Sequence, residues 1–543
     1  MRRSILLSLA FAAASFIGTT TSLSVSSIER AVSTVAGPKT DEPLSCETCE
    51  VIISAVSSLG DNSTTVAELI ALIDEGCTVI DLPLFQVLCD EIAAAGVNIS
   101  AAAFAFLDKE LNTLAWDIPL NFCSVFVPVC KIPCCDSNYA PEQLRLAPAP
   151  SSVGLNALSV TWITLNETQT STVQWGLANG PMNYSAVGVT RTYTLGGWIG
   201  VIHEAIMTNL LPGTQYTYTV GSTESWSTPV TFSTLPSNAG TPSRPLTIIN
   251  IGDMGWGPKS NATIARMNAL IDAGLIDAVV HQGDVSYADG AEQNWDVFGR
   301  KIQSISSRVP YLVSPGNHEQ VWWGGLPYRT RWSMPPPMDT SGNPLPLSLI
   351  GNRSFFSVDF GKVHWVMFDT ESPLDLGDVP VAEADWIKAD ITKARTSSPS
   401  QWIVTAAHRP LYCTNGNWKS SDKDCFTAAG VLRGQIEASF ISAKVDILLT
   451  AHMHGYERTV PVANSIPTVG ATTYIVNGAG GNRESNDNPA GDAPWSVPGA
   501  HFADIGYGLM TIVTSPTPGA SWLQYQFIRS ADGTVLDMVN ITK

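Results

Sequence analysis

The sequence predicts a multidomain protein in which an all-α module, an all-β sandwich and an α/β domain follow one another along 543 residues. Three observations carry this prediction. Apolar residues first recur at three- and four-residue spacing, then alternate with polar ones in short runs, and finally form buried strands separated by helical segments. A chain of this length also exceeds one ordinary domain.

The first 24 residues have the pattern of an export signal peptide. Arg2 and Arg3 precede an apolar run at 5–17, and small residues follow it. The run is too short to favour a membrane span. An even count of 10 cysteines agrees with an oxidising compartment. We therefore expect a soluble, exported protein that is either extracellular or held in a vacuolar or lysosomal lumen.

The charge balance excludes one class of partner. The chain has 30 Lys and Arg against 48 Asp and Glu, for a net charge of −18. It shows no basic stripe of the kind that replaces counterions on nucleic acid, so we expect no nucleic-acid partner. Seven Asn-X-Ser/Thr triplets in an exported chain predict glycosylation. They lie at Asn62, Asn98, Asn166, Asn183, Asn261, Asn352 and Asn540.

Residues 42–135 form the predicted helical module, because the stretches at 51–59 and 66–73 both have helical apolar spacing. Its principal cysteines are Cys46, Cys49, Cys77, Cys89, Cys123 and Cys130. Six cysteines permit fifteen disulfide pairings, and reasoning from the residues does not choose among them. A zinc site at the first pair is the alternative, which secretion and the lack of a matching second pair disfavour.

Residues 142–237 form the predicted sandwich. Polar and apolar residues alternate at 159–163, 172–175 and 214–220, and glycine and proline separate these runs. The Leu-Pro-Gly-Thr-Gln-Tyr stretch that ends at Tyr216 resembles the tyrosine corner of fibronectin-type sandwiches. A linker rich in serine, proline and glycine follows at 236–245.

Residues 246–543, including a C-terminal part at 470–543, form the predicted α/β domain. The expected buried strands are 246–251, 278–280, 311–313, 402–404 and 447–449, and 264–271 is an expected helix.

Polar side chains follow five of these strands at sharp turns. They occur in the motifs Gly252-Asp253, Gly283-Asp284-Val285-Ser286-Tyr287, Gly316-Asn317-His318-Glu319, Ala407-His408-Arg409-Pro410 and His452-Met453-His454. Ligands in α/β sheets bind at the carboxyl ends of strands, so these distant turns are expected to converge.

The converging residues suit two metal ions. Asp253, Asp284 and Asn317 offer oxygen, and Tyr287 adds a phenol. Imidazole nitrogen comes from His408, His452 and His454. Such a set without thiolate fits iron, manganese or zinc, and one carboxylate can bridge two ions.

Each residue alone has a structural explanation: a Gly-Asp pair usually forms a turn, and an asparagine caps a helix. We expect the other histidines, His203, His281, His364 and His501, to be structural. The ordered set of motifs makes the metal site the better explanation.

The motif set resembles the calcineurin-like metallophosphoesterases, and within them the purple acid phosphatases. Many relatives in the wider superfamily have histidine two positions after the first aspartate, where this chain has Gly255. The purple subgroup instead has a tyrosine three positions after the second aspartate, as Tyr287 follows Asp284. The resemblance covers 142–543 and implies a four-layer αββα catalytic domain. It also implies an acid phosphatase, and the signal-like N-terminus makes this a secreted acid phosphatase.

The resemblance further implies a role for each residue. Asp253, Tyr287 and His454 would hold Fe(III), and Asp284 would bridge the two ions. A divalent ion, either Fe, Zn or Mn, would be bound by Asn317, His408 and His452. His318 would be catalytic, stabilising the phosphate charge or protonating the leaving group. A metal-bound hydroxide would then attack a phosphomonoester.

Further histidines that plant members carry after the His408 motif are missing here. In that stretch we expect Cys413 to pair with Cys425. We expect Tyr412 and Asn415 to shape the loop rather than bind phosphate.

The cysteine spacing of 42–135 resembles the saposin B-type domain. That resemblance implies the pairings Cys46–Cys130, Cys49–Cys123 and Cys77–Cys89, and a lipid or membrane surface as a partner. Combined with a metallophosphoesterase, it suggests an alternative function, a sphingomyelinase-like phosphodiesterase that acts on phospholipid head groups. A non-catalytic secreted lipid-binding protein is a second alternative, which the complete ligand set disfavours.

Overall fold

The computed structural model describes residues 130–543, apart from 151–155, 321–322, 347–353, 372–376 and 399–400. The predicted export signal, nearly all of the predicted helical module and its three implied disulfides lie outside the described residues. Within the described part of the chain, we find no helix that is both long and apolar enough to cross a membrane.

The end of the segment predicted as helical is extended instead. Strand β1 (Ile132–Pro133) pairs in parallel with β7 (Trp198–Ile199). Proline lacks a backbone N–H and disfavours a helix at this point, which the apolar spacing further upstream did not reveal. Cys134 and Cys135, whose pairing the sequence left unassigned, form a disulfide with each other.

The predicted β-strands between 142 and 237 are present, and they form two four-stranded sheets. In order, one sheet contains β2 (Glu142–Pro148), β3 (Leu158–Thr164), β8 (Val201–Met207) and β6 (Val189–Arg191). The other contains β10 (Val230–Ser233), β9 (Gln215–Gly221), β4 (Thr172–Leu177) and β5 (Tyr184–Val187). Trp162, Trp175 and Tyr218 belong to their common core. The tyrosine corner is also present, because the Leu211 backbone N–H donates to the Tyr216 hydroxyl at 2.9 Å.

The following domain contains two larger sheets. The six-stranded sheet has the order β13 (Tyr311–Ser314), β12 (Ala278–Gln282), β11 (Leu246–Ile251), β23 (Gly506–Val513), β24 (Trp522–Arg529) and β25 (Val535–Thr542). Its first three strands are parallel, and the last three form an antiparallel meander.

The seven-stranded sheet has a parallel centre and antiparallel edges. Its order is β14 (Phe356–Phe360), β15 (Val363–Met367), β16 (Trp402–Ala406), β17 (Ile447–Thr450), β21 (Thr473–Asn477), β18 (Tyr456–Thr459) and β22 (Ser496–Phe502). A small hairpin joins β19 (Val462–Ala463) to β20 (Ile466–Pro467).

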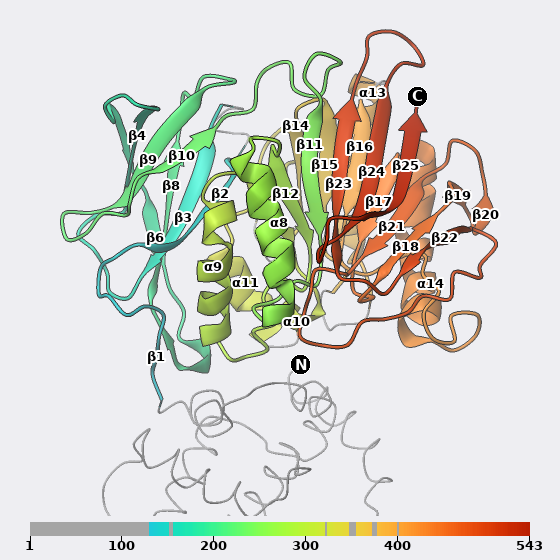
Figure 1. Ribbon diagram of the computed structural model, residues 1–543, viewed down its shortest axis with the longest axis horizontal. Coiled ribbons are helices and arrows are strands. Elements are labelled where there is room, and N and C mark those ends of the chain that lie inside the picture. The colour runs from blue at the N-terminus through green and yellow to red at the C-terminus, as the bar shows by residue number, and fades with distance from the viewer. Residues whose placement is uncertain (1–129, 151–155, 321–322, 347–353, 372–376, 399–400) are drawn as a thin grey trace, which may run out of the picture. The chain divides into compact units, whose positions relative to one another are not determined.

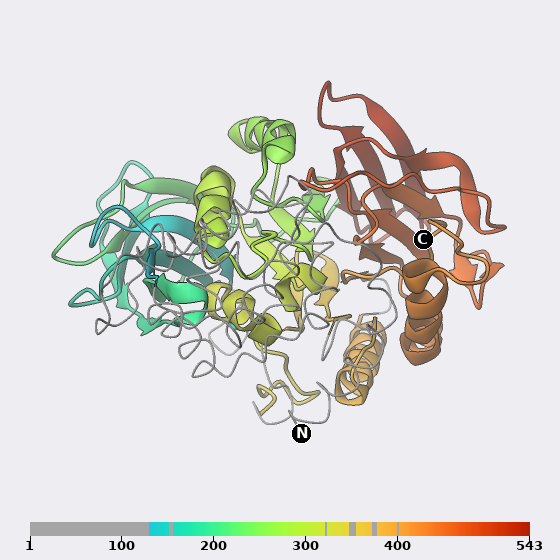
Figure 2. The same ribbon diagram turned by 90° about the horizontal axis from the view of Figure 1, so that it is seen from below.

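Helices cover the outer faces of both sheets (Figures 1 and 2). On one side lie α8 (Asn261–Asp272) and α9 (Gln293–Ser306). On the other lie α13 (Val381–Ser397), α14 (Ala429–Leu432) and α15 (Ala438–Ala443). Short helices α10 (Asn317–Gln320) and α11 (Leu326–Arg331) follow β13, and single helical turns span Lys423–Ala428 and Arg433–Glu437.

Two apolar cores hold these layers together. The larger one joins α8 and α9 to the six-stranded sheet and continues into the seven-stranded sheet through Trp365 and Trp402. The second lies between the seven-stranded sheet and the opposite helices, with Ile387 of α13 and Phe440 of α15 in it. The expected four-layer αββα arrangement is therefore what these elements form. It leaves the carboxyl ends of β11, β12, β13, β16 and β17 available for polar loops.

Candidate metal centre

Each of the five motifs begins immediately after one of these buried strands. Asp253 and Asp284 follow the last residues of β11 and β12 by two positions, and Asn317 follows β13 by three. His408 and His452 follow β16 and β17 by two. A strand buried on both faces fixes the place of the next few residues, so five short loops bring their polar side chains to one edge.

The backbone at the centre has positive φ at several residues, a conformation that residues other than glycine disfavour. Asp253, Asp284, Tyr287 and His452 have φ values of 54°, 48°, 55° and 67°. A residue other than glycine in the left-handed region is disfavoured by roughly 1–3 kcal/mol and persists only where its surroundings enforce it. Such residues gather at functional sites, and here four of them belong to the predicted ligand set.

Two glycines of the motifs are required by close approach. A Cβ on Gly283 would lie 2.4 Å from Nδ1 of His408, and its φ is +80°. A Cβ on Gly316 would lie 2.1 Å from Oδ1 of Asp284. Any larger residue at either position would push apart the loops that carry the polar side chains.

The first group of candidate ligands is centred on Tyr287. Its hydroxyl donates to Oδ1 of Asp253 at 2.9 Å and lies 3.0 Å from Nε2 of His454. The same His454 nitrogen lies 3.3 Å from Oδ1 of Asp253. Burial, followed by the carboxylates of Asp253 and Asp284, holds the pKa of Tyr287 well above its ordinary value. Without a cation beside it, this phenol therefore keeps its proton.

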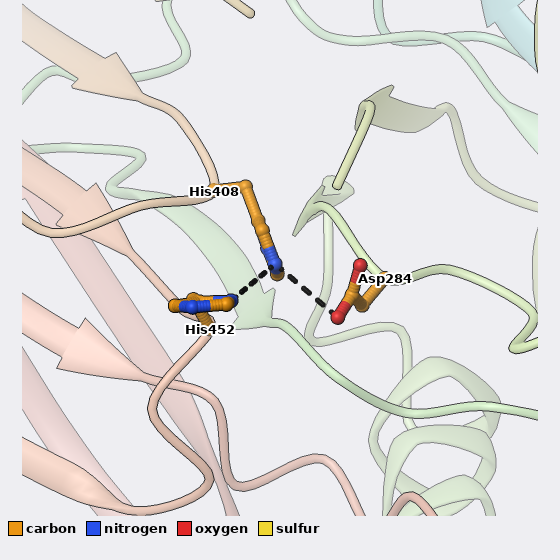
Figure 3. A group of neighbouring side chains, drawn as sticks. All are labelled: Asp284, His408 and His452. Atoms are coloured by element: carbon orange, nitrogen blue, oxygen red, sulfur yellow. Dashed lines mark hydrogen bonds and ion pairs between the residues drawn. The ribbon is translucent and has the colours of Figure 1, made fainter. Parts of the chain in front are cut away.

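The second group is centred on His408 (Figure 3). Its Nε2 lies 3.0 Å from Oδ1 of Asn317, 3.2 Å from Oδ2 of Asp284 and 3.2 Å from Nδ1 of His452. In Figure 3 the His408 ring lies between His452 and Asp284, and each neighbour comes from a different strand end.

Asp284 belongs to both groups. It can share a cation with His408 and His452, and another with Asp253 and His454. A fully buried carboxylate common to two such groups is the arrangement that two neighbouring ions need. Oxygen donors dominate, imidazole completes the set, and no thiolate takes part. These residues fit a pair of hard or borderline cations.

Backbone carbonyls orient two of the histidines. The Nδ1 atom of His408 lies 3.1 Å from the oxygen of Gln282, and Nδ1 of His454 lies 3.2 Å from that of Ser485. Each ring thus directs Nε2 at the site. Burial alone would lower the pKa of His408, but the charge and hydrogen bond of Asp284, together with the charges of Asp253 and Glu371, raise that pKa to about 10. Burial would also lower the pKa of His454, but Asp253, Glu484 and Asp487 together raise it to about 9. The site therefore attracts positive charge.

His318 lies at the edge of the two groups. It is 7% exposed, and its ring centroid is 4.2 Å from that of Tyr287. Its Nε2 lies 3.8 Å from Oδ2 of Asp284 and 3.6 Å from Oε1 of Glu484. The predicted catalytic residue is thus close enough to reach a molecule bound at the candidate ions.

Sequence reasoning assigned no role to Glu319 and Glu484, two carboxylates at this site. Glu319 accepts hydrogen bonds from the backbone N–H of Val285 at 3.0 Å and of Gly316 at 2.9 Å, which ties the Asp284 loop to the Asn317 loop. Glu484 lies 3.6 Å from Nε2 of His454. Glu319 was visible as the last residue of its motif, whereas Glu484 has no sequence signal beyond its position after the late glycine run at 478–481.

The loop after His408 has the expected structural character. Cys413 and Cys425 form a disulfide, and the Tyr412 hydroxyl donates to Glu437 at 2.6 Å. Tyr412 is buried and packs against Tyr474 and Trp495. Its side chain therefore supports the loop.

Family models match three successive parts of the chain. Residues 141–234 match the model described as "Purple acid Phosphatase, N-terminal domain", and 246–456 match "Calcineurin-like phosphoesterase". Residues 471–538 match "Iron/zinc purple acid phosphatase-like protein C". All five motifs fall within the second match.

Individual relatives agree with these matches. The chain is 32% identical over 340 residues to acid phosphatase type 7 of Homo sapiens, covering 60% of this chain and 72% of that protein. The chain belongs to the purple acid phosphatase family. As a member of this family it is a metal-dependent acid phosphatase.

Two further purple acid phosphatases match at lower identity. Purple acid phosphatase 22 of Arabidopsis thaliana is 27% identical over 393 residues, covering 70% of this chain and 81% of that protein. A purple acid phosphatase from yellow lupin seeds matches in structure with a TM-score of 0.61 and 24% identity, over 74% of each chain. This structural likeness shows that the fold is shared.

Proposed function

We propose that this purple acid phosphatase hydrolyses phosphate monoesters at a binuclear centre of Fe(III) and a divalent ion. In this proposal Asp253, Tyr287 and His454 hold Fe(III), and Asn317, His408 and His452 hold Fe, Zn or Mn in the divalent state. Asp284 bridges them. The observation that carries the proposal is the membership of Asp284 in both candidate groups, with a phenol in one group only.

The asymmetry of the two groups supports the assignment of the metals. A phenolate is a hard, charged donor, which favours ferric iron, and Tyr287 contacts Asp253 and His454. The group around His408 has instead a neutral amide oxygen and two imidazoles, a set that suits a divalent ion. When bound, such a pair of cations neutralises phosphate charge and lowers the pKa of water to make a nucleophile.

His318 has the position to assist the reaction. Its Nε2 lies beside Asp284 and Glu484. A phosphate bound to ions that Asp284 bridges would therefore contact the His318 ring. From there the imidazolium can donate a hydrogen bond to a phosphate oxygen or a proton to the leaving alkoxide.

The visible spectrum of purified protein, together with its metal content, tests the proposal. Wild type should show a broad phenolate-to-iron band, and Tyr287→Phe should abolish it. Tyr311→Phe is the matched control, because Tyr311 is another buried tyrosine whose hydroxyl pairs with a histidine, His281, at 2.9 Å. A colourless active enzyme that contains zinc alone would contradict the iron assignment and would favour the phosphodiesterase alternative.

We also propose that the chain is exported and glycosylated. The signal-like first 24 residues and the cysteine content support export. Four of the seven acceptor asparagines, Asn166, Asn183, Asn261 and Asn540, are exposed, and the other three lie outside the described residues. A mass shift after enzymatic deglycosylation of the secreted protein is expected.

Lipid targeting by residues 42–135 is a further part of the proposal, and the saposin-like cysteine spacing alone supports it. Deletion of 42–135 should weaken binding to liposomes and spare hydrolysis of a soluble phosphomonoester. Unchanged liposome binding would contradict the targeting role.

A further inference from the structure

The second ring nitrogen of His452 has its own polar environment. Nδ1 of His452 faces the candidate centre, 3.2 Å from Nε2 of His408. Nε2, on the other side of the ring, lies 3.1 Å from Oδ1 of Asp424 and 2.9 Å from Nη1 of Arg409. A hydrogen-bond acceptor, the Asp424 carboxylate, and a hydrogen-bond donor, the Arg409 guanidinium, therefore compete for Nε2 of His452.

The outcome of this competition decides whether His452 can bind a cation. A neutral imidazole has one N–H and one bare nitrogen, and only the bare nitrogen can coordinate a metal. Coordination through Nδ1 therefore requires the proton on Nε2, where it needs an acceptor. Arginine has no acceptor, so the carboxylate of Asp424 is the partner within reach that favours this tautomer.

We propose that Asp424 is a positioning residue that keeps His452 in the tautomer whose Nδ1 can bind the divalent ion. This inference rests on the proposed binuclear centre and adds to it a residue that no motif contains. Carboxylates commonly orient metal-bound histidines in this way from the outer side of the ring.

The Arg409 guanidinium holds the Asp424 carboxylate in place. Nη1 of Arg409 donates to Oδ1 of Asp424 at 2.5 Å, and Nε donates to Oε2 of Glu371 at 2.8 Å. The side chains of Arg409 and Glu371 are 2% and 0% exposed, and that of Asp424 is 23% exposed. A buried guanidinium held by two carboxylates has little freedom to move, and this restricts Asp424 as well.

The backbone of Asp424 is anchored to the His-x-His loop. Its N–H donates to Oδ1 of Asp422 at 2.9 Å, and the next residue, Cys425, is joined by a disulfide to Cys413. The sulfur of Cys425 lies 3.6 Å from that of Met453, the residue between the two histidines of the motif. The loop that presents the carboxylate and the loop that presents the imidazole are thus packed together.

Loss of the carboxylate should do more than remove one hydrogen bond. Without it, Arg409 remains 2.9 Å from Nε2 of His452 as a donor, and this favours the tautomer with the proton on Nδ1. That tautomer has no lone pair for the divalent ion. The ferric group should be spared, because His454 is oriented separately by the carbonyl of Ser485.

Divalent-metal affinity is the quantity that tests the inference. We would measure Zn²⁺ binding by equilibrium dialysis on full-length protein that keeps its iron, with the visible band reporting the ferric group. Asp424→Ala should weaken Zn²⁺ binding by about 10- to 100-fold and leave the band unchanged. Asp424→Asn should recover part of the affinity, since an amide oxygen can still accept from Nε2.

Asp492→Ala is the matched control. The Asp492 carboxylate accepts hydrogen bonds from Lys419 at 2.6 Å and from Trp418 at 2.8 Å. Both partners lie in the loop that the Cys413–Cys425 disulfide closes. Its removal should leave Zn²⁺ affinity as in wild type.

Wild-type affinity in both Asp424 variants, with the second ion bound normally, would overturn the role of Asp424 alone. If wild type itself bound a single ion, the binuclear centre and this inference would both be wrong.

Discussion

Asp253 and His452, 199 positions apart, are joined by a 2.9 Å hydrogen bond from the His452 backbone N–H to Oδ2 of Asp253. The other oxygen of this carboxylate accepts from Tyr287. One buried side chain at the end of β11 thus fixes the loop that supplies His452 and His454, and also positions the phenol of the other candidate group. The two sheets are held together at the site by this contact as well as by their apolar core.

Asp253→Asn should reduce both iron content and turnover. An amide offers one oxygen in place of two, so either Tyr287 or the His452 N–H loses its acceptor, and the charge that attracts Fe(III) is lost. We expect kcat to fall by at least about 100-fold, beyond the roughly 10- to 100-fold typical of residues behind the ligands. Asp277→Asn, at the opposite end of the same sheet, is the control, because it pairs with Arg244. Full iron occupancy in Asp253→Asn would contradict the ligand assignment.

Glu319→Gln should destabilise the protein by about 1–3 kcal/mol, because one of two buried backbone N–H groups loses its acceptor. Both oxygens of Glu319 are in use, one for Val285 and one for Gly316. Urea denaturation above pH 8 measures the change, because burial raises the pKa of Glu319 to about 8 and the carboxylate must be ionised for both oxygens to be acceptors only. A variant as stable as wild type would show that these loops are held by other contacts.

His364 should make the protein less stable in alkaline solution. Burial would lower its pKa, but hydrogen bonds to Asp359 and Asp390 outweigh burial and raise it to about 9. The folded state thus binds the proton more tightly than the unfolded chain, with its pKa of 6.5. The resulting stabilisation, roughly 3 kcal/mol at most, is complete below about pH 6.5 and is lost as pH rises through about 9.

His364→Gln should therefore be less stable than wild type at pH 6, and the difference should shrink by pH 10. Chemical denaturation at both values measures it. A constant difference across this range would show that packing, and not charge, explains the role of His364.

His203 should have the opposite effect. Burial lowers its pKa to about 4, and its ring lies between Thr164 and Ser171 at 2.7 and 2.8 Å and stacks on Trp162. The folded state resists protonation, so the stabilisation is complete above about pH 6.5 and is lost as pH falls through about 4. The buried neutral His203 should therefore make the folded protein less stable in strong acid.

His203→Gln should flatten that part of the pH profile. An amide can keep one of the two hydroxyl contacts without titrating, so stability should change less between pH 6.5 and 4 than in wild type. Unfolding midpoints across this range are the measurement. A profile as steep as that of wild type would assign the acid sensitivity to other groups.

Continuous apolar runs made the central strands predictable. The strand expected at 246–251 is β11 with the same bounds, and those expected at 278–280 and 311–313 are β12 and β13, which extend slightly further. Strands buried on both faces need apolar residues at every position, and such runs are visible without any partner. The meander of β23, β24 and β25 was not predicted in detail, because in β24 and β25 buried positions alternate with more exposed ones and no comparable apolar run results.

The motifs, their order and their glycines were determined by the sequence alone, because five of the seven candidate ligands follow a strand by two or three positions, where local chain geometry places them. The other two, Tyr287 and His454, belong to the same short motifs. The tertiary structure decided which other carboxylates contact the histidines of the site. Asp424 reaches His452 across 28 positions, and Glu484 reaches His318 across 166. Nothing local specifies such pairs, since they exist only when separate loops pack against the same imidazole.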